Sequence, residues 1–296
     1  MLKQQIHQIV QANPDYAAIT PVIEKEILHH DIMDVLIKQG AMQTLTFIGG
    51  TALRMCYNSA RLSEDLDFNG GYDFKPADFA GLESEIQKYI QNKYETEVWV
   101  NKPTADKQGD TVSWKISIVK EANRPDLPRQ KMHIDVCAIP SFDVEKRPLL
   151  NHYNIVVPTE GILVPVQSLR ETLADKLIAV AYRARRIKPR DIWDIVWIKQ
   201  RGVDLSKDLV EKKLAARNKQ TDDFRAALAL QMTKLQQDDE VRDDFNMEMS
   251  RFIPKQIKER TLDNPEYWAY VQAEISAIAS ALLNDSAPKK KFDMGL

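Results

Sequence analysis

The sequence predicts an α/β (α+β) fold in which a mixed sheet flanked by helices is followed by an all-helical domain. Two observations support this fold. Between residues 45 and 137, short segments that alternate apolar and polar residues are interleaved with segments of helical spacing. From residue 168 onward, apolar residues recur only at helical spacing. We therefore expect an N-terminal domain over residues 1–165 and a helical domain over residues 166–296 that completes a cleft.

The first domain is expected to begin with helices, because residues 2–39 have helical spacing with a break at Asn13-Pro14. The apolar run LTFIGG then predicts a strand that leads through a glycine turn straight into a helix. Another helix is expected over residues 76–94, with a proline near its start. Alternating residues predict the remaining strands at 65–68, 95–100, 111–119 and 131–137.

Composition places the chain among ordinary soluble proteins. Hydrophobic residues make up 44% and charged residues 28% of the 296 residues, and the formal net charge of -2 predicts no particular partner. No apolar run approaches the length of a membrane span and the first residues lack a signal-peptide core, so we expect a cytoplasmic protein without a membrane contact. Cys56 and Cys137 are too sparse for a disulfide framework or a metal motif, and we expect two buried thiols.

The stretch RLSEDLDF at residues 61–68 carries the most informative charges. In a strand, Asp65 and Asp67 point to the same face, about 7 Å apart, and the apolar residues beside them point to the other face. Two like charges so close repel each other, and they need compensation by Lys or Arg, by solvent, or by a hard divalent cation that takes oxygen ligands. On its own, the pair is more typical of an exposed acidic strand than of a catalytic site.

Three neighbouring features favour chemistry at these carboxylates. Gly49-Gly50-Thr51 forms a strand-to-helix turn whose backbone N–H groups can hold phosphate, although a tight turn alone would also explain the glycines. Asp135 lies between two apolar residues of a central strand, where burying a carboxylate is costly unless it is paired or bound to metal. Ser63 supplies a hydroxyl beside the first two carboxylates.

A glycine turn, a D-x-D strand and a later strand aspartate together form the arrangement that a two-metal phosphoryl-transfer site needs. Asp65, Asp67 and Asp135 are therefore predicted to bind Mg²⁺ or Mn²⁺ ions that bridge the oxygens of a nucleoside triphosphate. Asp135 is also expected to help activate the attacking hydroxyl. A phosphatase of the D-x-D type fits less well, because its first aspartate should end the first strand of the domain, where this chain has a glycine turn.

Two segments of the helical domain are predicted to face the same cleft. If residues 168–186 form one helix, Lys176 lies at the margin of its apolar stripe, and Asp175 points to solvent. Arg183 follows Lys176 two turns along the same edge. Lys176 could therefore reach a phosphate across the cleft, or it could cover the core with its aliphatic stem.

The segment KPRDIWDIVWIK is apolar nearly all round, so Asp191 and Asp194 should be buried and should need cationic partners. A purely structural role is also open for Asp191, because Pro189 suits the first helical position and the first turn of a helix favours an anion. The basic run over residues 183–190 is expected either to contact RNA phosphates or to be a solvated helix end.

FIGGTALR followed by RLSEDLDF resembles the AbiEii-like nucleotidyltransferase toxins of type IV toxin-antitoxin systems, within the polymerase-beta-like nucleotidyltransferase superfamily. The resemblance extends to about residue 200, because ETLADKLIAV and KPRDIWDI are similar to the lysine and Arg-Asp motifs of the family. It implies that Lys176 binds the nucleotide and acts in catalysis, and that Asp191 is the essential aspartate that holds Lys176 or Arg190. The chain departs from the superfamily in its Gly50-Thr51 pair, where Gly-Ser is usual, and in the 13 residues between Thr51 and Asp65.

The resemblance implies a metal-dependent enzyme that moves a nucleoside monophosphate from a nucleoside triphosphate to an acceptor. The acceptor that it implies is the 3′ end of transfer RNA, and a cognate antitoxin encoded nearby is expected to oppose the toxin. Two alternatives remain open: modification of a small molecule or a protein, and a catalytically weak fold that acts as a binding module. The intact aspartates and Lys176 argue against the binding module.

Overall fold

The computed structural model describes residues 1–103, 111–120, 127–183 and 185–283. Within them, a seven-stranded sheet has the order β3-β4-β5-β2-β1-β7-β6. The pairs β1–β7 and β2–β5 are parallel and the other neighbours are antiparallel, so the expected mixed sheet is confirmed. The strands are β1 (Thr46–Ile48), β2 (Leu66–Asn69), β3 (Val98–Asn101), β4 (Thr111–Ile118), β5 (Gln130–Cys137), β6 (Val144–Pro148) and β7 (Leu163–Gln167).

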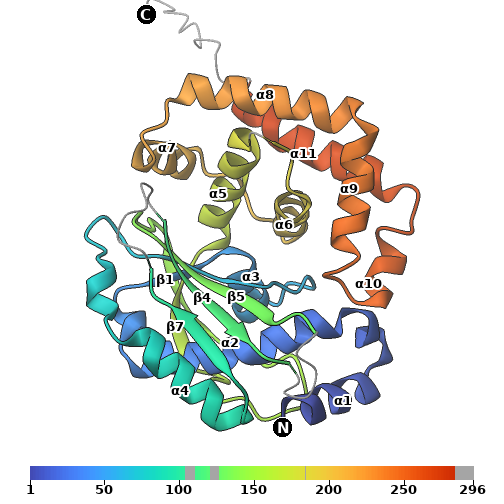
Figure 1. Ribbon diagram of the computed structural model, residues 1–296. Coiled ribbons are helices and arrows are strands. Elements are labelled where there is room, and N and C mark those ends of the chain that lie inside the picture. The colour runs from blue at the N-terminus through green and yellow to red at the C-terminus, as the bar shows by residue number, and fades with distance from the viewer. Residues whose placement is uncertain (104–110, 121–126, 184, 284–296) are drawn as a thin grey trace, which may run out of the picture.

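Helices lie around the sheet in two groups. Figure 1 shows the later helices gathered above the sheet, and α1, α2 and α4 around its lower part. The early group comprises α1 (Leu2–Ala12), α2 (Thr20–Lys38), α3 (Gly49–Tyr57) and α4 (Leu82–Tyr94). The later group comprises α5 (Leu169–Tyr182), α6 (Pro189–Gln200), α7 (Lys207–Ala216), α8 (Thr221–Gln237), α9 (Asp239–Met249), α10 (Lys255–Arg260) and α11 (Tyr267–Leu283). No helix of the described residues is both long enough and apolar enough to cross a membrane.

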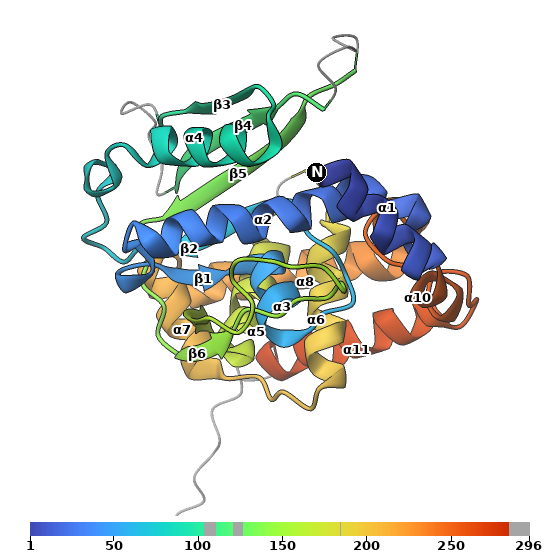
Figure 2. The same ribbon diagram turned by 90° about the horizontal axis from the view of Figure 1, so that it is seen from below.

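The N-terminal helices break where the sequence predicts. Asn13 leaves the helical conformation and its side chain accepts a hydrogen bond from the backbone N–H of Asp15, at 3.1 Å. A 3-10 turn over Pro14–Ile19 then leads into α2. Helix α4 lies along β3 and contacts α2, and this layer covers one face of the sheet's β3 end (Figure 2).

The expected single helix over residues 76–94 is wrong. The chain forms a 3-10 turn at Pro76–Phe79 and begins α4 only at Leu82. Gly81 lies between them with φ of +90°, in the left-handed region that glycine adopts without strain. The glycine therefore starts a new helix instead of lying inside one.

Two strands, β6 and β7, are absent from the sequence prediction. Strand β6 lies at the edge of the sheet, and its residues are mostly exposed and charged, so it lacks the alternation of a half-buried strand. Strand β7 contains Pro165, which weakens a strand assignment. The predicted domain boundary at residue 165 lies within β7, and the helical region follows from Leu169.

One cluster of buried apolar side chains extends from the sheet into the later helices. It includes Phe47 and Trp114 of the sheet and Trp193 and Phe245 of the helices. Of the two cysteines, Cys56 is buried as expected, whereas Cys137 at the end of β5 is only partly buried. The continuous core holds the sheet and the helical region against each other on both sides of a cleft.

Candidate active site

The three aspartates meet at one end of two parallel strands. Asp67 of β2 lies opposite Asp135 of β5, and Asp65 immediately precedes β2. The alternation predicted for β5 is confirmed, because its apolar residues are buried and Asp135 lies on the other face. All three aspartates line one cleft of about 330 Å³. Its other lining residues include Gly49, Gly50, Arg61, Ser63, Gln167, Asp175, Lys176, Arg183, Lys188, Arg190, Asp191 and Arg217.

The electrostatics of this acidic wall favour a cation. Burial, together with the charges of Asp135 and Asp65, raises the pKa of Asp67 to about 6. Asp65 accepts a hydrogen bond of 2.9 Å from the backbone N–H of His133, and Asp135 accepts one from the hydroxyl of Ser113. No Lys or Arg of the described residues lies within ion-pair distance of these three carboxylates. The charges of Lys176 and Lys188 offset this repulsion only in part, because the pKa of Asp67 stays raised.

The donor set fits a hard divalent cation that is shared with a substrate. Within the described part of the chain, no three or more His, Cys, Asp and Glu side chains are grouped as a ready-made metal site. Mg²⁺ commonly uses only one or two carboxylates and completes its shell with water and substrate phosphates. The acidic wall fits this mode of binding, in which the protein supplies only part of the ligands.

The glycine turn brings the backbone against the carboxylates. Helix α3 begins at Gly49, directly after β1, and Gly49 has φ of +78°. A Cβ atom on Gly49 would lie 2.5 Å from Oδ2 of Asp67, and one on Gly50 would lie 2.2 Å from Nη2 of Arg61. Both positions therefore require glycine, because no side chain fits between the turn and its neighbours.

Thr51 has a different place from the one that the sequence predicts. Its side chain is buried outside the cleft lining, and its hydroxyl donates to the backbone carbonyl of Asp65. Thr51 thus fixes the segment that carries the first aspartate. Ser63, in contrast, lines the cleft beside Gly50, as expected.

We expect Gly49→Ala to reduce transfer at least 10-fold, because the methyl group displaces the Asp67 carboxylate. It should also lower the free energy of unfolding by about 1 kcal/mol through its left-handed backbone. Gly202→Ala is a matched control, since Gly202 has φ of +73° and open space around its Cβ position. Enzyme assays and denaturant unfolding of both variants test this. Equal activity of Gly49→Ala and Gly202→Ala would show that Gly49 is needed for the turn conformation and not for the site.

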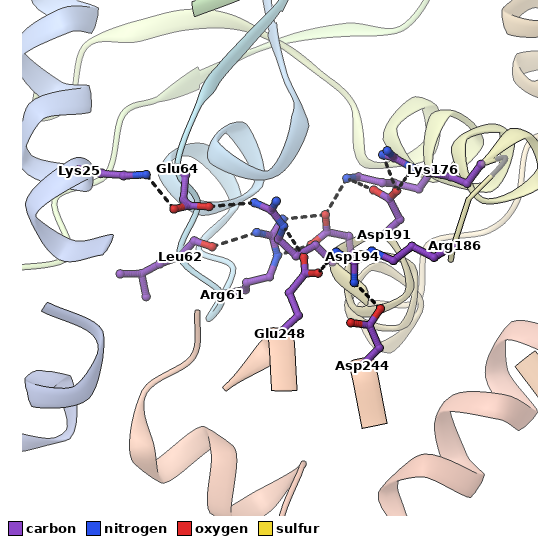
Figure 3. A network of polar contacts seen from close by, with 12 residues as sticks. Lys25, Arg61, Leu62, Glu64, Lys176, Arg186, Asp191, Asp194, Asp244 and Glu248 are labelled. Atoms are coloured by element: carbon purple, nitrogen blue, oxygen red, sulfur yellow. Dashed lines mark hydrogen bonds and ion pairs between the residues drawn. The ribbon is translucent and has the colours of Figure 1, made fainter. Parts of the chain in front are cut away.

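The opposite wall of the cleft is built on a buried network of charges. Nζ of Lys176 lies 2.8 Å from Oδ1 of Asp191 and 2.8 Å from Oδ2 of Asp194. Asp194 is fully buried and also accepts two hydrogen bonds of 2.9 Å from Arg61, while Asp191 pairs with Arg183 at 3.0 Å. Figure 3 shows Arg61 and Lys176 converging on Asp194, with Asp191 beside them. The network ties α5 and α6 to the loop that carries the aspartates.

The charges in this network hold Asp191 ionised. Burial alone would raise the pKa of Asp191, but Lys176 and Arg183 outweigh burial and lower this pKa to about 2. Asp191 and Asp194 also raise the pKa of Lys176 against the effect of its burial. The expectation that buried Asp191 and Asp194 need cationic partners is confirmed, and the partners of Asp191 are Lys176 and Arg183, not Arg190.

Asp191→Asn is expected to lower the free energy of unfolding by about 2 kcal/mol at pH 7, because the folded-state pKa lies about two units below the usual value. The ionised carboxylate stabilises the fold above about pH 4, and this contribution is lost as the pH falls toward 2. Denaturant unfolding of both proteins between pH 7 and pH 3 measures the difference. A difference that does not shrink with falling pH would contradict the ion-pair assignment.

Other expectations for the helical region need correction. Helix α5 ends at Tyr182, four residues earlier than predicted. Asp175 does not point to solvent: it lines the cleft and forms ion pairs with buried Lys213 at 2.9 Å and with Arg217 at 2.8 Å. The sequence gives no sign of these partners, because they lie on α7 and beyond it, roughly 40 residues away in the chain.

Glu64 of RLSEDLDF and two arginines of the basic run, Arg186 and Arg190, form further ion pairs. Glu64 binds Lys25 at 2.7 Å and lies 3.6 Å from Arg190. Arg190 and Arg186 both bind Glu248 on α9, at 3.0 Å and 2.9 Å. Arg190 therefore joins α6 to the segment before β2 and to α9, whereas Arg186 is held by α9 alone. This pairing reduces the charge that both arginines offer to RNA.

Sequence comparison identifies the family of the protein. The chain matches the family described as nucleotidyl transferase AbiEii toxin, type IV TA system, over residues 31–273. The chain belongs to the AbiEii family. The resemblance seen in the glycine turn and the D-x-D strand is thereby confirmed, and the AbiEii match spans both the sheet and most of the helical region. Its function class is that of a nucleotidyltransferase toxin.

Two solved structures are similar to this chain, and one of them, MenT4, shares its fold. MenT4, a nucleotidyltransferase toxin from Mycobacterium tuberculosis, is 16% identical, and the match covers 95% of this chain and 90% of that chain with a TM-score of 0.51. JHP933 from Helicobacter pylori is also 16% identical, with 88% and 93% of the two chains covered and a TM-score of 0.45. No curated protein matches the sequence.

Proposed function

We propose that the protein is a Mg²⁺- or Mn²⁺-dependent toxin that transfers a nucleoside monophosphate from a nucleoside triphosphate to the 3′ end of transfer RNA. The observation that carries the proposal is the polarity of the cleft. Three carboxylates line one wall, and among the described residues no Lys or Arg lies within ion-pair distance of them, while lysine and arginine side chains line the other wall. A metal–triphosphate complex, with cations on one side and phosphate oxygens on the other, matches this polarity. The cytoplasm supplies both substrates, and a cognate antitoxin would oppose the activity there.

The three aspartates have two roles in the proposed reaction, metal binding and proton transfer. Asp65, Asp67 and Asp135 would hold the divalent ions, which when bound supply Lewis-acid stabilisation of the charge on the phosphate oxygens. The acceptor hydroxyl attacks the α-phosphorus, its oxygen–phosphorus bond forms, and the bond to the leaving pyrophosphate breaks. In this proposal Asp135 accepts the proton of that hydroxyl.

The backbone turn and the basic wall position the nucleotide. The close approach that Gly49 and Gly50 allow leaves the backbone at the start of α3 open toward the cleft, where N–H groups and the helix dipole favour a phosphate. Ser63 adds a hydroxyl on the same side. The network of Lys176 and Asp191 keeps the facing wall rigid, as positioned electrostatic groups require.

The decisive experiment incubates purified protein with Mg²⁺, total RNA and each of the four labelled nucleoside triphosphates in turn. Label in an RNA band of transfer RNA size, removed by chelation of the metal, would support the proposal. Nuclease digestion of that RNA then tests whether the label is at the 3′ end. Label on protein or on a small molecule would favour the other acceptor classes. No label with any triphosphate would favour the binding module.

A further inference from the structure

The lysine and arginine side chains that line the cleft differ in whether carboxylates of the protein neutralise their charge. Five of the six are engaged by carboxylates within 3.6 Å: Arg61 by Asp194, Lys176 by Asp191 and Asp194, Arg183 by Asp191, Arg190 by Glu64 and Glu248, and Arg217 by Asp175. The sixth is Lys188. Within the described residues, neither an ion pair nor a hydrogen bond holds its ammonium group.

The backbone of Lys188 is fixed and its side chain is half-buried, although its ammonium group has no ion pair among the described residues. It is the N-cap residue of α6, and its carbonyl accepts hydrogen bonds from the N–H groups of Asp191 and Ile192, so its backbone is fixed. Its side chain is half-buried, and burial lowers the pKa of Lys188, assisted by the charge of Arg190. A half-buried cation without a partner is unfavourable in the free protein, so an anionic ligand would relieve it.

The charge of Lys188 acts across the cleft. It contributes to lowering the pKa of Asp67, against the larger effects that raise this pKa. Lys188 and the three aspartates of the acidic wall line the same cleft. An anion between them that also carries metal ions would satisfy both walls, and a triphosphate has this chemistry.

Lys176 is less suited to bind that anion. Its ammonium lies 2.8 Å from each of two carboxylates, so two of its three donor positions are used and its charge is already compensated. A phosphate would have to compete with both carboxylates for it. The charge of Asp191 acts on Lys188 as well, but no carboxylate of the described residues lies within ion-pair distance of its ammonium group.

We propose that Lys188 binds a phosphate group of the nucleoside triphosphate, and that Lys176 is a positioning residue that orients Asp191 and Asp194. The assignment rests on the proposed function in taking a nucleoside triphosphate as the ligand. It gives the basic run a specific role: one of its members binds the nucleotide, while Arg186 and Arg190 join the parts of the fold.

The test compares Lys188→Met with Lys199→Met, a matched control in which a half-buried lysine is removed from the other end of α6. Equilibrium binding of labelled nucleoside triphosphate is measured with Mg²⁺ and without RNA, and again with inorganic tripolyphosphate as competitor. For Lys188→Met we expect the Kd of both ligands to rise 10- to 100-fold, the loss expected for a hydrogen bond to a charged group. For Lys199→Met we expect no change.

Thermal unfolding separates this role from a structural one. Because Lys188→Met removes an unpaired half-buried charge, its Tm without ligand should equal or exceed that of the wild type. Tripolyphosphate should raise the Tm of the wild type and not that of the variant. Lys188→Arg should recover part of the binding, since it keeps the charge.

The remaining outcomes show whether Lys188 binds the triphosphate or the RNA acceptor, and they separate failure of this inference from failure of the proposed function. Unchanged triphosphate binding by Lys188→Met would overturn the inference, whether or not its KM for RNA rises. A rise in the KM for RNA alone would assign Lys188 to the acceptor. If the wild type binds triphosphate through Lys188 but transfers nothing, the inference holds and the proposed function fails. If the wild type binds neither ligand, both are wrong.

Discussion

Asp67→Asn is expected to abolish nucleotidyl transfer, with a loss of at least about 10³-fold in kcat/KM. The amide removes a charge that is proposed to bind metal, at a position opposite Asp135 and two residues from Asp65. Asp65→Asn should have an effect of the same order. Asp222→Asn, at an exposed side chain of α8, is the control and should keep full activity. Near-normal transfer by Asp67→Asn at saturating Mg²⁺ would refute the metal assignment.

The same substitution should stabilise the free protein. The folded-state pKa of Asp67, about 6, lies above its unfolded-state value near 4, so ionisation of Asp67 weakens the fold as the pH rises through this range. Without divalent metal, Asp67→Asn should raise the free energy of unfolding by about 1–2 kcal/mol at pH 7.5. The gain should vanish below about pH 4. Added Mg²⁺ should stabilise the wild type and not the variant.

Asp194→Ala is expected to have the largest effect on stability, lowering the free energy of unfolding by about 3–5 kcal/mol. The change leaves Arg61 buried without a carboxylate and removes one of the two partners of Lys176. Denaturant unfolding at pH 7 measures the loss, and transfer should fall as well, because the two sides of the cleft separate.

A double substitution provides the control for Asp194. Arg61→Met combined with Asp194→Leu replaces the buried pair with apolar groups, and it should recover a large part of the stability lost by Asp194→Ala. Recovery of stability without recovery of transfer would show that the pair also positions the site. If the free energy of unfolding of Asp194→Ala is within about 1 kcal/mol of the wild-type value, the charge network contributes little to the stability of the fold.

Alternation, apolar surroundings and glycines in the sequence were enough to predict the parts of the site that depend on residues close together in the chain. The alternation in β5 predicts that Asp135 lies opposite the buried face, because side chains of a strand alternate between faces. The apolar surroundings of Asp191 and Asp194 predict their burial, and burial predicts cationic partners. The two glycines predict the turn, since only a residue without a side chain fits there.

Other features could not be read from local patterns. Strand β6 is an exposed edge and carries little periodicity, so its pairing with β7 is visible only in the assembled sheet. The 76–94 segment has helical spacing throughout, and its break depends on the backbone that Gly81 adopts.

The sequence by itself determined the chemical types in the cleft: three aspartates after a glycine turn, and a lysine and an aspartate on later helices. Only the tertiary structure decided which charges neutralise one another. Arg61 lies 133 residues from Asp194 in the chain and still binds it with two hydrogen bonds. Lys188 lies three residues from Asp191, yet in the part of the chain that the structure describes it has no ion pair. The physical reason is that periodicity records which face of an element is buried, while ion pairing depends on distances between elements that meet only when the core closes.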